Sequence, residues 1–175
     1  KKYPEMKFAS PVSGTVKAVV RGDRRKVLYV KVKADETQQF VDFGIKDIEK
    51  LDGKAIKEAL LASGLFSYIQ QLPYAVTTTP DTMPKAIFVS AFRDMPLASD
   101  FEVELKGNEK DFQTGLTALS KIQKTYLGVS VHQTASVLVN AKDVEINIFE
   151  GKCPAGNVGV QVNHVAPVNK GEVVW

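Results

Sequence analysis

The chain has 175 residues, of which 44% are hydrophobic and 25% are charged, and its net charge is +3 from 23 basic and 20 acidic residues. This length suits one domain, or one domain with an appendage, and the apolar content is enough to build a core. Because the positive charge is weak and dispersed, with no Lys/Arg block interleaved with aromatic residues, we expect no nucleic-acid partner. No uncharged run approaches the roughly 18 residues of a membrane-spanning helix, and Lys1-Lys2 leads into Tyr3-Pro4, which is unlike a signal peptide.

One cysteine and two histidines limit the metal and redox chemistry of the chain. Cys153 can form no internal disulfide, and this composition fits a reducing compartment. Together with His132 and His164 it does not make a typical zinc site, and a cysteine-ligated iron–sulfur cluster needs several thiolates. We therefore expect no metal site. The chain lacks a Met at position 1 and ends on the apolar run 173–175, which favours a segment of a longer protein.

Residues 6–43 have the pattern of β structure. Pro11–Gly14 predicts a turn, and the stretches Thr15–Val20 and Val27–Val32 predict strands rich in β-branched residues. The densest basic cluster, Arg21–Lys26, lies between these two strands, and we interpret it as a solvated turn.

A short apolar run predicts the organising strand of the rest of the chain. Ala86–Val89 lies between Pro84 and the polar pair Arg93-Asp94, so we expect a central strand over Lys85–Ala91, buried on both faces. Strands of this kind belong to α/β layers with helices on each side.

Two helical patterns flank that strand. The first runs from Asp52 to Leu72, with Asp52 as the N-cap and Gly64 where a helix commonly ends. The second runs from Asn108 to Ile122 with apolar residues on one face.

Further elements follow in the last third of the chain. Thr125–Val131 and Val144–Phe149 predict strands, whereas residues 136–141 fit a helical turn or a strand equally well. Val158–Val165 is a possible helix.

The segment before that helix is the one candidate for binding phosphate. Gly151, Gly156, Asn157 and Gly159 lie in a glycine-rich loop between a strand and a helix, a geometry in which backbone amides can bind phosphate. The spacing matches neither G-x-G-x-x-G nor a P-loop. The favoured interpretation is therefore a purely structural loop, with phosphate binding as the alternative.

The two ends of the chain share a second type of pattern. The stretch SPVSGTVKAV resembles the half-barrel of biotinyl and lipoyl carrier domains, and the segment from Val165 to Trp175 has a similar turn. We therefore expect residues 1–45 with 165–175 to form a β barrel-sandwich module, and residues 46–164 to form a Rossmann-like α/β domain. The modifiable Lys of the carriers has no counterpart, because Lys26 lies beside arginines.

Four stretches carry a resemblance over essentially the whole chain: KFASPVSGTVKAVVRGDRRKVLYVKV, PKAIFVSAFRDMPLASD, DFQTGLTALSKI and CPAGNVGVQVNHVAPVNKGEVVW. Together they resemble the A subunits of the bacterial Na+-translocating NADH:quinone oxidoreductases, of which this chain would be an internal segment. One departure lies before the PAG loop, where the family more often has Gly-Pro-His and this chain has Gly151-Lys152-Cys153-Pro154. Any role that the family assigns to that histidine therefore cannot be carried over to this chain.

The resemblance implies a peripheral subunit on the cytoplasmic face of the bacterial inner membrane. Its complex oxidises NADH, reduces quinone (ubiquinone) in the respiratory chain and exports Na+. FAD, FMN, riboflavin and the iron–sulfur centre of that complex would belong to other subunits, and the membrane-embedded B subunit would be the main partner. A quinone-related role is attached to this subunit in the family, but no motif locates a quinone site in the chain.

Three hypotheses of different classes follow. The first is a cofactor-free scaffold subunit of the sodium pump. The second is a redox subunit that binds flavin or NADH, as do the similar flavin subunit of complex I and the C subunit of the Rnf complex. The third is a carrier or adaptor domain of the biotinyl/lipoyl type.

Overall fold

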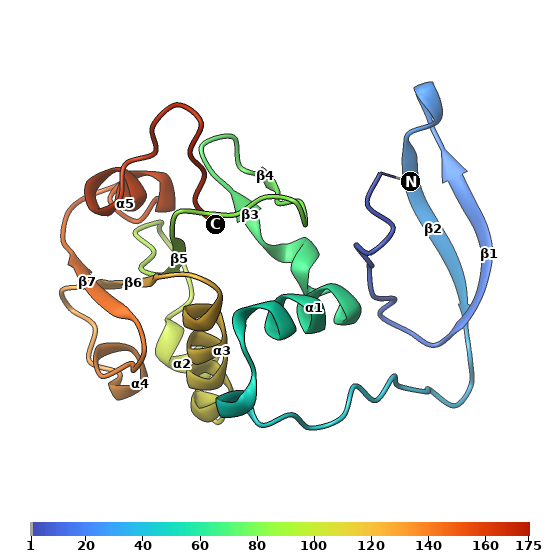
Figure 1. The fold of residues 1–175 in the computed structure, drawn as a ribbon, viewed down its shortest axis with the longest axis horizontal. Coiled ribbons are helices and arrows are strands. Elements are labelled where there is room, and N and C mark those ends of the chain that lie inside the picture. The colour runs from blue at the N-terminus through green and yellow to red at the C-terminus, as the bar shows by residue number, and fades with distance from the viewer. Residues whose placement is uncertain (1) are drawn as a thin grey trace. The chain divides into compact units, whose positions relative to one another are not determined.

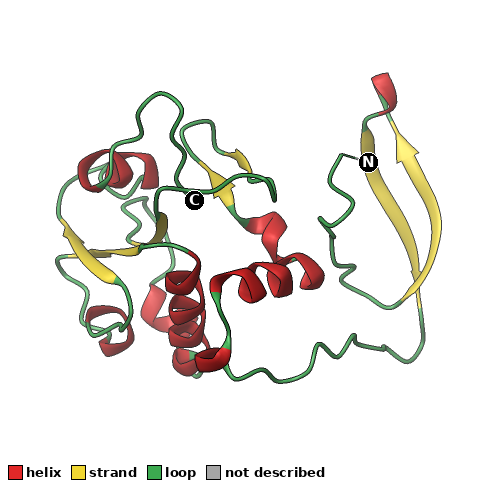
Figure 2. Cartoon of the chain, viewed as in Figure 1, coloured by secondary structure: helices red, strands yellow, loops and turns green. Residues whose placement is uncertain are grey.

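A computed structural model describes residues 2–175, which form two compact units (Figures 1 and 2). One unit contains the residues up to Lys7 together with Lys46–Trp175, and the other contains Phe8–Ile45. The larger unit is a mixed α/β domain and the smaller one is a β ribbon. The expected fold class, an α/β domain joined to a small β module, is confirmed.

The α/β unit alternates helices and strands along the chain. In chain order its elements are η2 (Ile48–Lys50), α1 (Gly53–Ser63), η3 (Leu65–Tyr68), β3 (Gln70–Gln71), β4 (Val76–Thr77), β5 (Ile87–Ala91), α2 (Phe101–Leu105), α3 (Glu109–Ile122), β6 (Thr125–Ser130), α4 (Ser136–Val139), β7 (Glu145–Phe149) and α5 (Val158–Val165). The undecided residues 136–141 thus begin as a short helix.

Local sequence signals set the ends of α1. The Asp52 carboxylate accepts a hydrogen bond from the Ala55 amide at 2.8 Å, as an N-cap does, and Gly64 ends the helix with φ 82°. Both predicted caps are confirmed. The helical pattern does not continue to Leu72, because a 3₁₀ turn over Leu65–Tyr68 leads into β3.

The main sheet has the order β5-β6-β7, and both neighbouring pairs are parallel. The strand over Ile87–Ala91 is confirmed, but the most buried strand is β6, which lies between the other two. Residues 85–91 are nonetheless internal, because residues 173–175 pair with β5 on the side away from β6. An apolar run indicates that a strand is buried on both faces, but it does not indicate which strands are its neighbours.

The C-terminal residues extend the sheet on the free side of β5. The Trp175 amide donates to the Ala86 carbonyl at 3.1 Å, and the Phe88 amide donates to the Trp175 carbonyl at 2.6 Å. The Lys85 amide likewise donates to the Val173 carbonyl at 2.9 Å, so the two segments run in the same direction. The chain crosses from β7 to the opposite edge of the sheet, which is the strand order of a doubly wound fold.

This placement corrects the expected domain boundary. Residues 165–175 belong to the α/β unit, where Val174 also forms a β-bridge with Leu72, and not to a module with residues 1–45. The turn that resembled a carrier half-barrel instead closes onto the start of β5.

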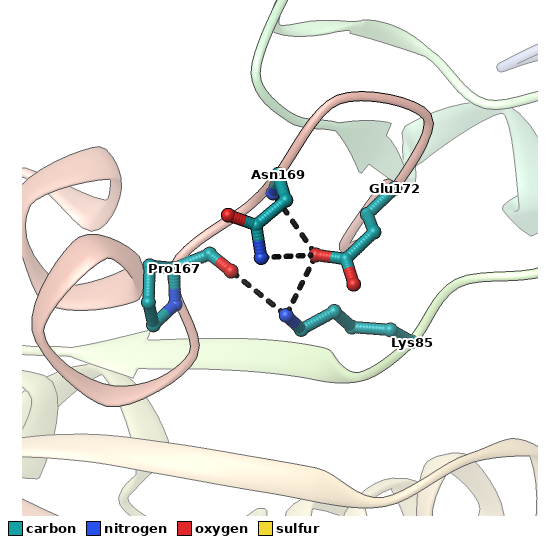
Figure 3. A network of polar contacts seen from close by, with 4 residues as sticks. All are labelled: Lys85, Pro167, Asn169 and Glu172. Carbon is teal, nitrogen blue, oxygen red and sulfur yellow. Dashed lines mark hydrogen bonds and ion pairs between the residues drawn. The ribbon is translucent and has the colours of Figure 1, made fainter.

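A polar network holds that turn (Figure 3). The Lys85 ammonium donates to the Pro167 carbonyl at 2.7 Å and to Glu172 Oε2 at 2.8 Å. The same Glu172 oxygen accepts from the backbone amide and the side-chain amide of Asn169, at 2.9 and 3.2 Å. The network joins residues that are more than 80 positions apart in the sequence.

Helices cover both faces of the sheet. On one face the core contains Ala91, Leu116, Leu127, Val129 and Leu138, from β5, β6, α3 and α4. On the same face, towards α1, a second cluster contains Ile56, Phe66, Ile87, Ile122 and Trp175. On the other face α5 packs through a third cluster of Ala86, Tyr126, Val162, Ala166 and Val174. Alternate residues of each strand face opposite layers, as a pleated strand requires.

The smaller unit is an antiparallel ribbon of β1 (Gly14–Arg21) and β2 (Val27–Ala34), joined by the short 3₁₀ turn η1 (Asp23–Arg25). The two predicted strands are confirmed, whereas residues 6–10 form no strand. The part of the ribbon that the structure describes has no buried residue.

Candidate functional site

The loops that follow β5, β6 and β7 meet at one edge of the parallel sheet. Open α/β sheets place their ligands at this carboxyl edge. Here a hollow of about 260 Å³ lies beyond β5 and β6. Its lining consists of Ala91, Phe92, Arg93, Ala98, Ser99, Asp100, Phe101, Glu102, Ser130, His132, Gln133 and Thr134.

Arg93 organises one wall of this hollow. Its guanidinium donates to Ser99 Oγ at 2.9 Å and to Glu104 Oε1 at 2.8 Å, and it lies 4.1 Å from the centre of the Phe101 ring. The hydrogen bond from Ser99, and then that from Arg93, lower the pKa of the Glu104 carboxyl below its ordinary value. Arg93 is thus engaged within the protein, so its charge is matched by Glu104 and is not a free anion site.

The predicted glycine-rich loop lies beyond β7, at the same edge. Asn157 caps α5, because its Oδ1 accepts from the Gly159 amide at 2.8 Å. The Asn157 amide donates to the Pro154 carbonyl at 2.9 Å. Gly151 lies at the start of the loop with φ +145°. The helix over Val158–Val165 is confirmed.

An aspartate from a different loop occupies the position where a phosphate would be expected. Asp94 Oδ2 accepts from the Gly156 amide at 2.9 Å, and a Cβ at position 156 would lie 2.6 Å from the Asp94 backbone nitrogen. Three amides of this loop, those of residues 156, 157 and 159, therefore already have acceptors within the protein. A carboxylate at this place disfavours a phosphate group.

The sequence interpretation missed Asp94 as a partner of this loop. Its contact spans 62 residues, and no local pattern in the sequence indicates such a pairing. Met95 and Cys153 make a second contact between the same two loops, with their sulfur atoms 3.9 Å apart.

The histidines and the cysteine are not brought together as a metal site. His132 lines the hollow, whereas His164 Nδ1 lies 2.8 Å from the Val160 carbonyl of its own helix. Within residues 2–175 no group of three or more His, Cys, Asp or Glu side chains could hold a metal ion. No helix in the same range is long and apolar enough to cross a membrane.

The strand order and the loops at this edge define a doubly wound α/β domain, which a β ribbon precedes in the sequence. The family profile described as the NqrA second alpha/beta domain matches residues 51–175. The profile described as the NqrA N-terminal barrel-sandwich hybrid domain matches residues 1–35. The chain belongs to the NqrA family.

Several curated proteins are similar along the whole chain, and each is named as the A subunit of a Na(+)-translocating NADH-quinone reductase. The protein from Yersinia pseudotuberculosis serotype O:1b is 32% identical, and the proteins from Saccharophagus degradans and Actinobacillus pleuropneumoniae serotype 5b are 33% identical. In each comparison all of this chain is aligned with 40% of the relative, so the chain spans less than half the length of these proteins.

Proposed function

We propose that the protein acts as a peripheral, cofactor-free subunit of a sodium-translocating NADH–quinone reductase. In this assembly the α/β domain serves as a scaffold on the membrane subunits, and flavins and the iron–sulfur centre are held by other chains. Family membership and whole-chain similarity to the A-subunit proteins support the place in the complex. The absence of a cofactor from this chain is supported by one contact.

That contact is the hydrogen bond from the Gly156 amide to Asp94. A Rossmann-type domain binds the pyrophosphate of its nucleotide on glycine-loop amides at the start of a helix. Here Asp94 places a carboxylate on the corresponding loop, and Asn157 caps the helix that follows. Negative charge at this point repels phosphate, which fits a domain that has the fold without the nucleotide.

Purification of the full-length protein from native membranes tests the place in the complex. A tagged copy should bring down the flavin-carrying membrane subunits of the reductase, and deletion of its gene should remove quinone-coupled NADH oxidation that depends on Na+. Recovery of the tagged protein without any membrane subunit, under conditions that preserve NADH–quinone reductase activity, would contradict the proposal.

The second candidate function is a redox subunit that binds flavin or NADH, and the hollow at the carboxyl edge favours it. Calorimetric titration of the full-length protein with NADH and with FMN separates the two. We expect no binding in the micromolar range. If binding does occur, His132→Gln should weaken it and His164→Gln should not, because only His132 lines the hollow. Micromolar binding with this pattern would replace the cofactor-free proposal.

A further inference from the structure

The β ribbon carries the whole net charge of the chain. Residues 8–45 contain seven basic and four acidic residues, and the remaining residues contain sixteen of each sign. All seven basic side chains are exposed. Six of them lie at the end of β1, in the turn or on β2. We call these six the basic surface: Arg21, Arg24, Arg25, Lys26, Lys31 and Lys33.

No carboxylate in the described residues forms an ion pair with this surface. Among its side chains, the Arg21 guanidinium donates a hydrogen bond of 3.2 Å to the Arg25 carbonyl, and the Lys31 ammonium lies 5.7 Å from the centre of the Tyr29 ring. Within residues 2–175 these six charges are therefore not neutralised by a carboxylate.

The pairing of the two strands gives one face of paired valines and an opposite face, called the basic face below, on which Lys31 and Lys33 lie among Ala18, Val20 and Tyr29. Val16 pairs with Val32 and Val19 pairs with Val30, which places four valines on one face. On the opposite face Ala18 pairs with Lys31 and Val20 pairs with Tyr29. Alternation along β2 adds Leu28 to the apolar face and Lys33 to the basic one.

This division indicates which face of the ribbon further β structure would cover. A two-stranded ribbon is marginally stable alone, so the valine face needs a cover. The matching family domain is described as a barrel-sandwich hybrid, and the relatives are longer than this chain, so further β structure of the same protein can supply the cover. The basic face and the turn then point outward.

The turn between β1 and β2 has arginine at two positions whose backbone conformation favours other residues. Arg24 and Arg25 have φ values of 53° and 60°. Asparagine or glycine adopts this left-handed conformation more readily. Two successive arginines in it are consistent with a role for their charge.

We propose that the basic surface docks on the anionic headgroups of a lipid membrane. Clusters of four to eight basic residues bind anionic lipids without a fixed geometry, which suits long side chains distributed around a turn. Tyr29 lies on the basic face, half exposed, and tyrosine is favoured at the headgroup layer of membranes. The inference rests on the proposed membership of a membrane complex, because this places the ribbon near a bilayer.

Vesicle binding by the full-length protein tests this surface without the rest of the complex. Vesicles of phosphatidylcholine with phosphatidylglycerol should bind the protein, and vesicles of phosphatidylcholine alone should not. Raising the salt from about 0.1 to about 1 M should abolish binding, because the Debye length falls from about 10 to about 3 Å.

The double variant Arg24→Asn/Arg25→Asn removes two charges while asparagine suits the turn. We expect its partition onto anionic vesicles to fall about 25-fold, at about fivefold for each charge. The matched control Lys106→Gln/Lys110→Gln removes two exposed charges from the α/β unit and should bind as the parent does.

Equal binding of the two double variants, or equal binding to charged and uncharged vesicles, would overturn the proposal. Tighter binding to a polyglutamate peptide than to the anionic vesicles would assign the surface to an acidic protein partner and would also overturn it. These outcomes are independent of co-purification with the membrane subunits, so failure here leaves the proposed function distinguishable.

Discussion

Gly128 lies in the middle of β6, where the side chain of Gln161 from α5 approaches the sheet. A Cβ at position 128 would lie 2.5 Å from Gln161 Oε1 and 3.2 Å from the Phe149 ring. Gln161 is fully buried, and its Nε2 donates to the Ala155 carbonyl at 3.3 Å, which holds the amide in this position. The glycine is required here because two layers approach closely, and no turn or unusual φ is involved.

Gly128→Ala should therefore lower the free energy of unfolding by about 1–3 kcal/mol, the usual cost of overpacking a core. Gln161→Ala removes the obstructing side chain, so the same glycine substitution should cost less in that background. A double-mutant cycle from denaturant unfolding measures this coupling. Equal costs of Gly128→Ala in both backgrounds would show that the two residues do not compete for the same space.

Glu172 is the acid-sensitive residue of the C-terminal turn. The hydrogen bond from Lys85, and then that from the Asn169 amide, lower the pKa of its carboxyl below the ordinary value of 4.5. The pKa of Glu172 is lower in the folded state than in the unfolded state. The network therefore stabilises the turn fully at pH values above the ordinary pKa, and this stabilisation is lost as the pH falls through the lowered pKa. Acid should loosen this turn first at Glu172.

Carbon-13 NMR titration of Glu172 measures this shift. Lys85→Met should raise the pKa of Glu172 towards 4.5, since it removes the principal hydrogen bond. Lys124→Met is the control, because Lys124 pairs with Glu145 at 2.8 Å and not with Glu172. A titration of Glu172 that is the same in the parent and in Lys85→Met would contradict the network.

At the scale of single elements, α1 depends on its N-cap. Asp52→Ala should lower the stability by about 1 kcal/mol, because the Ala55 amide loses its acceptor. Asp52→Ser keeps an acceptor and should restore most of the loss. The denaturant midpoint, at constant m, measures both changes. An unchanged midpoint in Asp52→Ala would mean that the cap contributes nothing to the folded state.

The sequence predicted elements where one local signal dominates. Asp52, Gly64 and the apolar run at 86–89 identified α1 and β5, because caps and apolar runs act within a few residues. The strand order and the place of 165–175 were not predicted, because they depend on pairings between residues such as Trp175 and Phe88. β-branched residues at alternating positions indicate a strand and do not identify its partner.

The candidate site shows the same limit. The glycine-rich loop at 151–159 and its helix were located from sequence, because a strand followed by glycines and an apolar pattern is a local signal. Asp94 fills this loop from the end of another strand, and the hollow depends on residues 91–102 meeting residues 130–134. These contacts between distant segments depend on the order of the strands in the parallel sheet, and the local sequence does not predict them.

The two compact units differ in the amount of apolar surface that they bury. The α/β unit contains three core clusters, whereas the ribbon at 8–45 contains none among its described residues. Trp175, the single tryptophan, is 5% exposed and packs edge-on against Phe66 at 5.4 Å between ring centres. Its fluorescence therefore reports on the larger unit alone.

A fragment of residues 46–175 should consequently fold by itself in one cooperative transition, with its tryptophan emission blue-shifted until that transition. A peptide of residues 8–45 should lack stable β structure in far-UV circular dichroism, because an isolated two-stranded ribbon has no core to offset its conformational entropy. Residues 1–175 should unfold with the same midpoint, followed by tryptophan fluorescence, as residues 46–175. The only expected difference is the small contribution to stability of Met6, which packs on the second cluster. A midpoint that collapses when residues 8–45 are removed, with residues 1–7 retained, would show that the ribbon contributes to the core of the α/β unit.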